Sequence, residues 1–197
     1  MNRGRLEAFS DGVIAILVTI MVLDLRPPSG AGFGDLRPLL PKLLVYLLSF
    51  TFLAIYWNNH HHLMQVVERI NGRVLWANMG LLFCLSLTPA ATAWLGPHSR
   101  AAAPTVVYGL VLLGSAIAYF VLTRALLMIH PPGSSLAVAI GRDWKGKLSA
   151  VAYVVAVAIA LIVPWLAIAI YVAVAVVWLV PDRRIERVTT ERAPRGG

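Results

Sequence analysis

Carboxylates and histidines, the side chains that most often handle protons and metal ions, stand inside apolar stretches of this chain. Asp11 lies within the apolar run of residues 6–25, and Asp24 lies near its far end. A charged side chain at the centre of a membrane helix costs about 2.5–3.5 kcal/mol on insertion scales, and it normally faces a bundle interior or a water-filled path. The first apolar run is therefore the first candidate for a functional element.

Helical periodicity divides this run into two faces. When successive residues are placed about 100° apart, an apolar stripe with a single hydroxyl lies within about 60° of Ile16. The stripe consists of Phe9, Gly12, Ile16, Thr19, Ile20 and Leu23. Ser10 and Asp11 lie more than about 110° away, where they can bond to neighbouring helices. Periodicity alone leaves two interpretations of the stripe open: ordinary packing between helices, or a surface that faces something narrow or repeated.

A second polar feature, Trp57-Asn58-Asn59-His60-His61-His62, lies at the end of the next apolar run. Adjacent residues of a helix point about 100° apart, so three consecutive histidines do not converge easily on one metal ion. No carboxylate or cysteine stands beside them at a helical ligand spacing. We therefore expect no metal site and no cofactor. His60 and His61 follow Trp57 by three and four residues and share a face with it.

No motif of enzyme catalysis is present in the sequence, neither Gly-x-Ser-x-Gly nor His-Glu-x-x-His nor a P-loop, and we do not expect an enzyme. A proton-coupled carrier that uses Asp11 and His60–His62 stays open as an alternative. Carriers usually have paired helix breaks, and only Pro89 comes close to one. A membrane-embedded enzyme that uses the His60–His62 cluster is a third possibility, which stoichiometric zinc or iron in the purified protein would favour.

The composition indicates an all-α membrane protein. Of the 197 residues, 59% are hydrophobic and 13% are charged, and the mean hydropathy is +0.76. These values exclude a soluble domain and a disordered chain. The net charge of +8 does not indicate nucleic-acid binding, because the charges stand between and after the apolar runs. No cleavable signal peptide is evident, so we expect the first run to be retained.

Six transmembrane helices are expected in one domain of residues 1–181, followed by a short cytoplasmic tail of residues 182–197. The last two helices come from one uncharged block, residues 148–180. As a single helix this block would be about 50 Å long, well over the hydrocarbon thickness of about 30 Å, and Pro164 stands near its middle. The expected spans are about 6–25, 39–61, 74–95, 101–122, 148–163 and 165–180.

The distribution of Lys and Arg predicts the orientation. If the N-terminus is cytoplasmic, the outside loops carry only Arg26, Arg37, Lys42 and Arg100, and the inside segments carry the other Lys and Arg residues. An excess of basic residues on the cytoplasmic side is the usual arrangement. We therefore expect a multi-pass protein of the plasma membrane with both termini in the cytoplasm.

One motif resembles a known family. Arg5-xxx-Phe9-Ser10-Asp11, followed by Gly12-Val13-xx-Ile16-xx-Thr19, is similar to the opening helix of the endolysosomal potassium channel family (transmembrane protein 175) in its short prokaryotic form. The resemblance implies a passive, potassium-preferring cation channel of the leak type, which conducts potassium and other monovalent cations across the lipid bilayer. It also implies a homotetramer that assembles around the first helix, with a central pore.

The resemblance also implies roles for individual residues. Ile16, Ile20 and Leu23 correspond to a hydrophobic constriction, and Thr19 to a ring of hydroxyls. The Trp-xx-His-His pattern and an Asn in the third span correspond to a hydrogen-bonded layer that supports the pore helix. The residues of this structural network are Arg5, Phe9, Ser10, Asp11, Trp57, Asn58, His60, His61 and Asn78.

The segment Thr105-Val106-Val107-Tyr108-Gly109 is similar to the filter loop of ordinary potassium channels, but we do not interpret it as one. That loop requires glycine at its third position so that its carbonyls line up, and Val107 is β-branched. The segment also lies within a continuous apolar run. We therefore expect it to be part of the fourth transmembrane helix.

Overall fold

The computed structural model describes residues 2–140 and 143–179, and these residues form helices without any strand. The tail expected at residues 182–197 lies outside the described residues. The helices are α1 (Arg3–Leu23), the 3-10 helix η1 (Phe33–Leu39), α2 (Leu40–Val66), α3 (Gly72–Ser86), α4 (Thr88–Leu95), α5 (Ala102–Leu127), α6 (Ser135–Ile140), α7 (Trp144–Ala160) and α8 (Pro164–Leu179). The prediction of an all-α protein is confirmed.

Several helices are long and apolar enough to cross a membrane. Among the described residues these are α1, η1 together with α2, α3 together with α4, and α5. The helices α7 and α8 have 17 and 16 residues. At the rise of an α-helix they are about 26 and 24 Å long, which is shorter than the hydrocarbon core of about 30 Å. Six crossings therefore stay a prediction.

Short polar signals set the helix ends. The Asn2 side chain accepts a hydrogen bond from the Gly4 amide at the start of α1, and Asn71 caps α3 through the Val74 amide. The Asp143 carboxylate caps α7 through the Gly146 amide at 3.1 Å. These side chains satisfy amides that the first turn of a helix leaves without a partner.

Two details differ from the sequence-based expectations. The third span is two helices, because α3 ends at Ser86 and α4 begins at Thr88, with Pro89 in its first turn. Proline has no amide hydrogen, so it fits the first turn of an α-helix and kinks or breaks the helix when it stands in the interior. The segment between the expected spans 101–122 and 148–163, where no helix is expected, contains the short helix α6.

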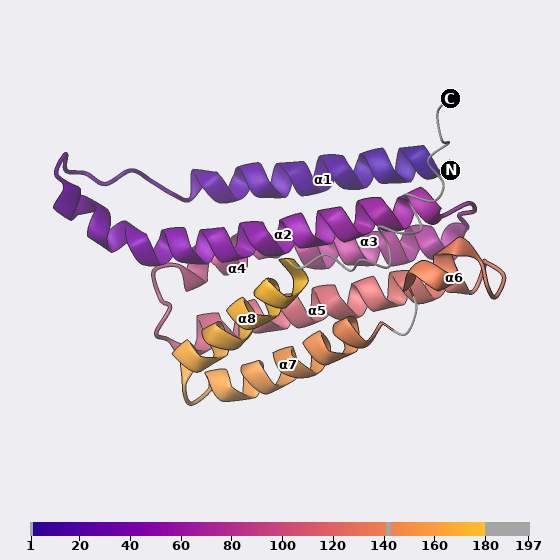
Figure 1. Cartoon of the computed structure of the whole chain (residues 1–197). Helices are drawn as coiled ribbons and strands as arrows, with labels where there is room; N and C mark the ends of the chain where they lie inside the picture. The colour runs from indigo at the N-terminus through magenta and orange to yellow at the C-terminus, as the bar shows by residue number, and fades with distance from the viewer. Residues whose placement is uncertain (1, 141–142, 180–197) are drawn as a thin grey trace, which may run out of the picture.

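The helices form a bundle in which α1 and α7 lie at opposite edges, and α8 crosses between α2 and α7 in this view (Figure 1). α1 runs antiparallel to α2 and also contacts α3 and α4, whereas α5 packs against α3, α4, α7 and α8. The hydrophobic core has two parts. One lies between α1, α3, the second half of α2 and the end of α5. The other lies between the first half of α2, α4, the start of α5 and the α7–α8 hairpin.

Candidate functional site

The two faces of α1 have different surroundings in the structure. Leu6, Ser10, Ile14, Leu17 and Met21 are buried against the rest of the chain. The apolar stripe on the other face does not pack against this chain. Its members Ile16, Ile20 and Leu23 are 57%, 45% and 76% exposed. Packing between helices of one chain therefore does not account for the stripe.

Thr19 is the single hydroxyl on this exposed face. Its Oγ1 donates a hydrogen bond to the carbonyl oxygen of Ile16 at 2.8 Å, within the same helix. The hydroxyl hydrogen is thus used locally, while the oxygen keeps the capacity to accept or to coordinate. The exposed face of α1 thus offers one side-chain oxygen between bulky aliphatic side chains.

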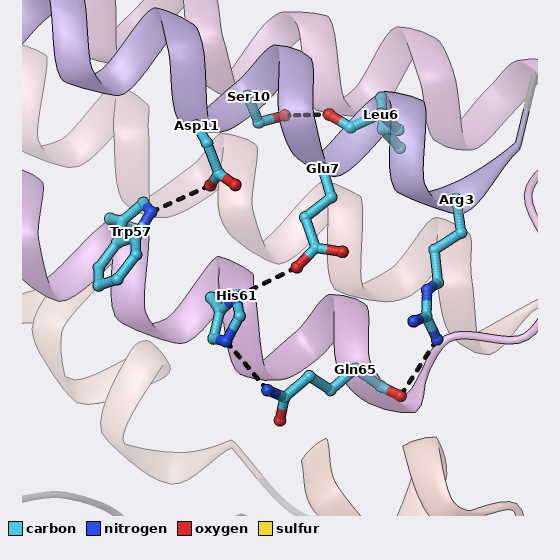
Figure 2. A network of polar contacts seen from close by, with 8 residues as sticks. All are labelled: Arg3, Leu6, Glu7, Ser10, Asp11, Trp57, His61 and Gln65. Carbon is cyan, nitrogen blue, oxygen red and sulfur yellow. Dashed lines mark hydrogen bonds and ion pairs between the residues drawn. The ribbon is translucent and has the colours of Figure 1, made fainter.

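A row of polar contacts joins the next face of α1 to α2, and we call it the polar ladder (Figure 2). Trp57 Nε1 donates to Asp11 Oδ1 at 3.0 Å, and His61 Nδ1 lies 3.1 Å from Glu7 Oε1. One turn further, Arg3 donates to the carbonyl oxygen of Gln65 at 3.3 Å. The partners are four residues apart on both helices, so the ladder keeps one register between two antiparallel helices.

His61 stands in the middle of the ladder and is held from three directions. Its Nε2 lies 2.9 Å from the side-chain nitrogen of Gln65, which can only donate. The hydrogen of the imidazole is therefore assigned to Nδ1, which donates to Glu7. The Trp57 ring stacks on the imidazole, with ring centroids 5.7 Å apart and an angle of 14° between the planes. These contacts fix the orientation of both rings.

Behind the ladder, Ser10, His60 and Asn78 form a fully buried cluster, which we call the amide cluster. Asn78 Nδ2 donates to Ser10 Oγ at 3.0 Å, and His60 Nε2 lies 2.8 Å from Asn78 Oδ1. Ser10 Oγ donates in turn to the Leu6 carbonyl oxygen at 2.9 Å. The cluster links α1, α2 and α3. His60 Nδ1 is buried and has no hydrogen-bond partner in the described part of the chain.

The structure brings together only part of the network expected from the sequence. Arg5, Phe9 and Asn58 are exposed and lie outside the ladder and the amide cluster. Glu7, Gln65 and Arg3 belong to the ladder, and sequence reasoning missed them. A signal was present, because Glu7 and Arg3 precede Asp11 by four and eight residues while His61 and Gln65 follow Trp57 by the same intervals.

The remaining chemical candidates have simple surroundings. Among residues 2–140 and 143–179, no group of three His, Cys, Asp or Glu side chains is placed to hold a metal ion. Thr105 Oγ1 donates to the carbonyl oxygen of Ala101 at 2.8 Å, as expected within a helix, and Tyr108 is buried. The segment Thr105–Gly109 is therefore an ordinary part of α5.

Comparisons with known proteins agree on one family. The family described as endosomal/lysosomal potassium channel TMEM175 matches residues 5–89. A potassium channel of Chryseobacterium sp. (strain P1-3) is 48% identical over 187 residues, which cover 95% of this chain and 97% of the relative. A potassium channel of Streptomyces collinus is 35% identical over 124 residues, which cover 59% of this chain and 60% of that protein.

A solved structure also matches. The crystal structure of a lysosomal potassium-selective channel TMEM175 homologue from Chamaesiphon minutus has a TM-score of 0.70 and 26% sequence identity. The match covers 90% of this chain and 96% of the other. The similarity therefore includes the C-terminal helices α5, α7 and α8 as well as the segment that carries the family motif.

Proposed function

Because this chain belongs to the TMEM175 family of potassium channels, we propose that it is a passive, potassium-preferring cation channel of the leak type. The observation that carries the proposal is the exposed apolar stripe of α1 in a chain that is similar over 95% of its length to a protein named a potassium channel. In a membrane an exposed apolar face is covered either by lipid or by a partner, and the location of this stripe on the helix that carries the family motif supports a partner.

One α1 helix does not enclose an ion path, so the proposal requires several copies. We place four copies of α1 around a central axis, each subunit presenting Ile16, Thr19, Ile20 and Leu23 to the axis. Ile16 and Ile20 lie about one helical turn apart, and Leu23 follows within the next turn. Rings of such side chains can gate a path by dewetting and can discriminate between ions by the cost of removing hydration water.

The polar ladder and the amide cluster have a supporting role in this proposal. Both lie on faces of α1 that are turned toward α2 and α3, away from Ile16. A narrow constriction works only if its side chains keep their radial position, and the ladder fixes the register of α1 against α2. We therefore assign Asp11, Trp57, His60, His61 and Asn78 to positioning and not to ion contact.

The orientation completes the proposal. We place the chain in the plasma membrane with six crossings and with both termini in the cytoplasm. In this arrangement few Lys and Arg residues lie in the outside loops, and most lie on the cytoplasmic side. The α7–α8 hairpin supplies the last two crossings, and its helices are short enough that local thinning of the bilayer is expected.

The central experiment measures potassium and sodium flux in proteoliposomes that contain wild-type protein, Ile16→Asn or Leu110→Asn. Leu110 is the matched control, because it is 50% exposed on the apolar helix α5 and does not belong to α1. We expect downhill flux without a proton gradient, changed in size or ion preference by Ile16→Asn and unchanged by Leu110→Asn. Flux that requires a proton gradient would favour the proton-coupled carrier that uses Asp11 and His60–His62.

A second experiment separates support from permeation. Glu7→Ala and Asp11→Ala should lower the yield and the stability of the tetramer more than they change the ratio of potassium to sodium flux. Size-exclusion chromatography with mass determination and the flux assay measure these two properties on the same preparations. If the variants assemble normally and change ion preference, the two side chains belong to the ion path and the supporting role is wrong.

A further inference from the structure

A cavity of about 290 Å³ lies between α2, α5, α7 and α8. The α2 residues that line it, such as Phe52 and Tyr56, lie at least about 100° around the helix from Trp57. The cavity is therefore separate from the polar ladder and from the exposed stripe of α1. Its volume is close to the lower end of the range of about 300–1,000 Å³ for small-molecule sites.

The wall of the cavity is rich in aromatic side chains. Six rings line it, from Phe52, Tyr56, Tyr119, Phe120, Tyr153 and Trp178. Phe52 meets Tyr153 edge to face with centroids 6.3 Å apart, which joins α2 to α7. Tyr56 meets Tyr119 in the same way at 6.0 Å, which joins α2 to α5. These contacts fix the positions of α2, α5 and α7 around the cavity.

Two polar groups of the wall are bonded within the protein. Trp178 Nε1 donates to Ser149 Oγ at 2.8 Å, and the Tyr119 hydroxyl donates to the carbonyl oxygen of Asn59 at 3.3 Å. The Tyr56 and Tyr153 hydroxyls also line the cavity, but its surface consists mainly of ring faces and aliphatic groups. A polar solute would lose its hydration there without replacement bonds, whereas a hydrocarbon chain would not.

Charged residues gather at one part of the rim. Lys147 and Asp143 line the cavity, and the Arg124 guanidinium lies 4.9 Å above the ring of Phe120, which also lines it. The Asp143 carboxylate accepts the Gly146 amide hydrogen and caps α7. Lys147 is thus an exposed cation of the rim, close in sequence to a carboxylate that is engaged by a helix N-terminus, and Arg124 lies beside the rim over Phe120.

We propose that this cavity binds an anionic phospholipid of the surrounding bilayer, with one acyl chain between the aromatic walls and the phosphate beside Lys147 and Arg124. Part of the rim is open, because Ile117 and Phe120 are 51% and 37% exposed, so a chain can enter from the lipid side. An apolar recess with cations at its mouth matches the two ends of such a lipid. The inference is independent of the ion path.

The first test is native mass spectrometry of the delipidated full-length protein, titrated with phosphatidylglycerol or with phosphatidylcholine of identical chains. The wild type should bind phosphatidylglycerol more tightly, by about fivefold for each basic residue near the headgroup. Lys147→Gln should lower this preference about fivefold, and Lys147→Arg and the distant control Arg100→Gln should keep it. Equal binding of the two lipids by the wild type would overturn the proposal.

The second test fills the cavity. Ala150 lines it, and Ala158 lies on the exposed side of the same helix α7. Ala150→Phe should remove one bound lipid per subunit, and Ala158→Phe should not. If Ala150→Phe leaves lipid binding unchanged, or changes only the oligomeric mass, the cavity holds no lipid and the proposal is wrong. If Ala150→Phe does not fold, Lys147→Gln decides, since Lys147 is an exposed side chain.

Discussion

Two buried polar clusters stand at different places in the bundle, and they are built from different chemistry. The amide cluster of Ser10, His60 and Asn78 uses an amide and an imidazole to join α1, α2 and α3. The second cluster, which we call the hydroxyl cluster, consists of Ser49, Thr92 and Tyr108 and joins α2, α4 and α5. Thr92 Oγ1 donates to Ser49 Oγ at 2.7 Å, and Ser49 Oγ lies 2.9 Å from the Tyr108 hydroxyl.

The clusters differ in what their central members can do alone. Ser49 Oγ also lies 3.0 Å from the Val45 carbonyl oxygen, and Thr92 Oγ1 lies 2.7 Å from that of Thr88. These hydroxyls therefore keep a partner on their own helix if the neighbouring helix is lost. The Asn78 amide has bonds only to Ser10 and His60 in the described part of the chain. The amide cluster thus depends on the arrangement of α1, α2 and α3, and the hydroxyl cluster depends less on its neighbours.

The largest effect on stability is expected for Asn78→Leu. This change keeps the side-chain size but leaves His60 Nε2 buried without a partner, which costs about 1–3 kcal/mol of unfolding free energy. Thermal or SDS unfolding in detergent measures the loss. Asn58→Leu is the matched control, because Asn58 is exposed on α2, and it should be near neutral. Equal stability of the two variants would mean that the amide cluster does not hold the helices together.

A smaller effect is expected for Tyr108→Phe, which removes the outer hydroxyl of the hydroxyl cluster. Ser49 retains Thr92 and Val45 as partners, so the loss should be near the average of about 0.6 kcal/mol for hydrogen bonds between membrane helices. The same unfolding assay applies, with Tyr46→Phe as the control, since Tyr46 is half-buried on α2. A loss as large as that of Asn78→Leu would remove the distinction between the clusters.

The difference between the clusters also explains how much of the site could be predicted from the sequence. Asp11, His60 and Asn78 are noticeable because their side chains are costly in a membrane helix unless they have partners. Ser49, Thr92 and Tyr108 give no such signal, because hydroxyl groups in apolar helices can bond to their own backbone. The apolar stripe of α1 was predictable from periodicity. That no other helix of the chain covers it could be seen only once the packing of the other helices was known.

The fold was predictable to a similar extent. The apolar runs predict helices, and Pro164 predicts the break between α7 and α8, since the second of these begins at Pro164. The helix α6 was missed because Ser135–Ile140 is only six residues long and follows Pro131-Pro132-Gly133, a strong loop signal. The aromatic cavity was not predictable, because its wall combines side chains of four helices whose relative placement the sequence does not state.

The smallest effect on the fold is expected for Trp57→Phe, at the exposed end of the polar ladder. Trp57 is 43% exposed, and phenylalanine can still stack on His61, so only the bond to Asp11 is lost. An exposed contact of this kind contributes about 0.2–1 kcal/mol or less. The informative measurement is therefore the comparison of subunit unfolding with the oligomeric mass.

One outcome is that the unfolding free energy of the Trp57→Phe subunit is unchanged while the assembly dissociates more readily. The ladder would then differ from both buried clusters, because it would hold α1 in place for contacts between subunits instead of stabilising the single chain. If Trp57→Phe instead destabilises the subunit as much as Asn78→Leu, the ladder and the amide cluster act as one network, and the separation of exposed support from buried support is wrong.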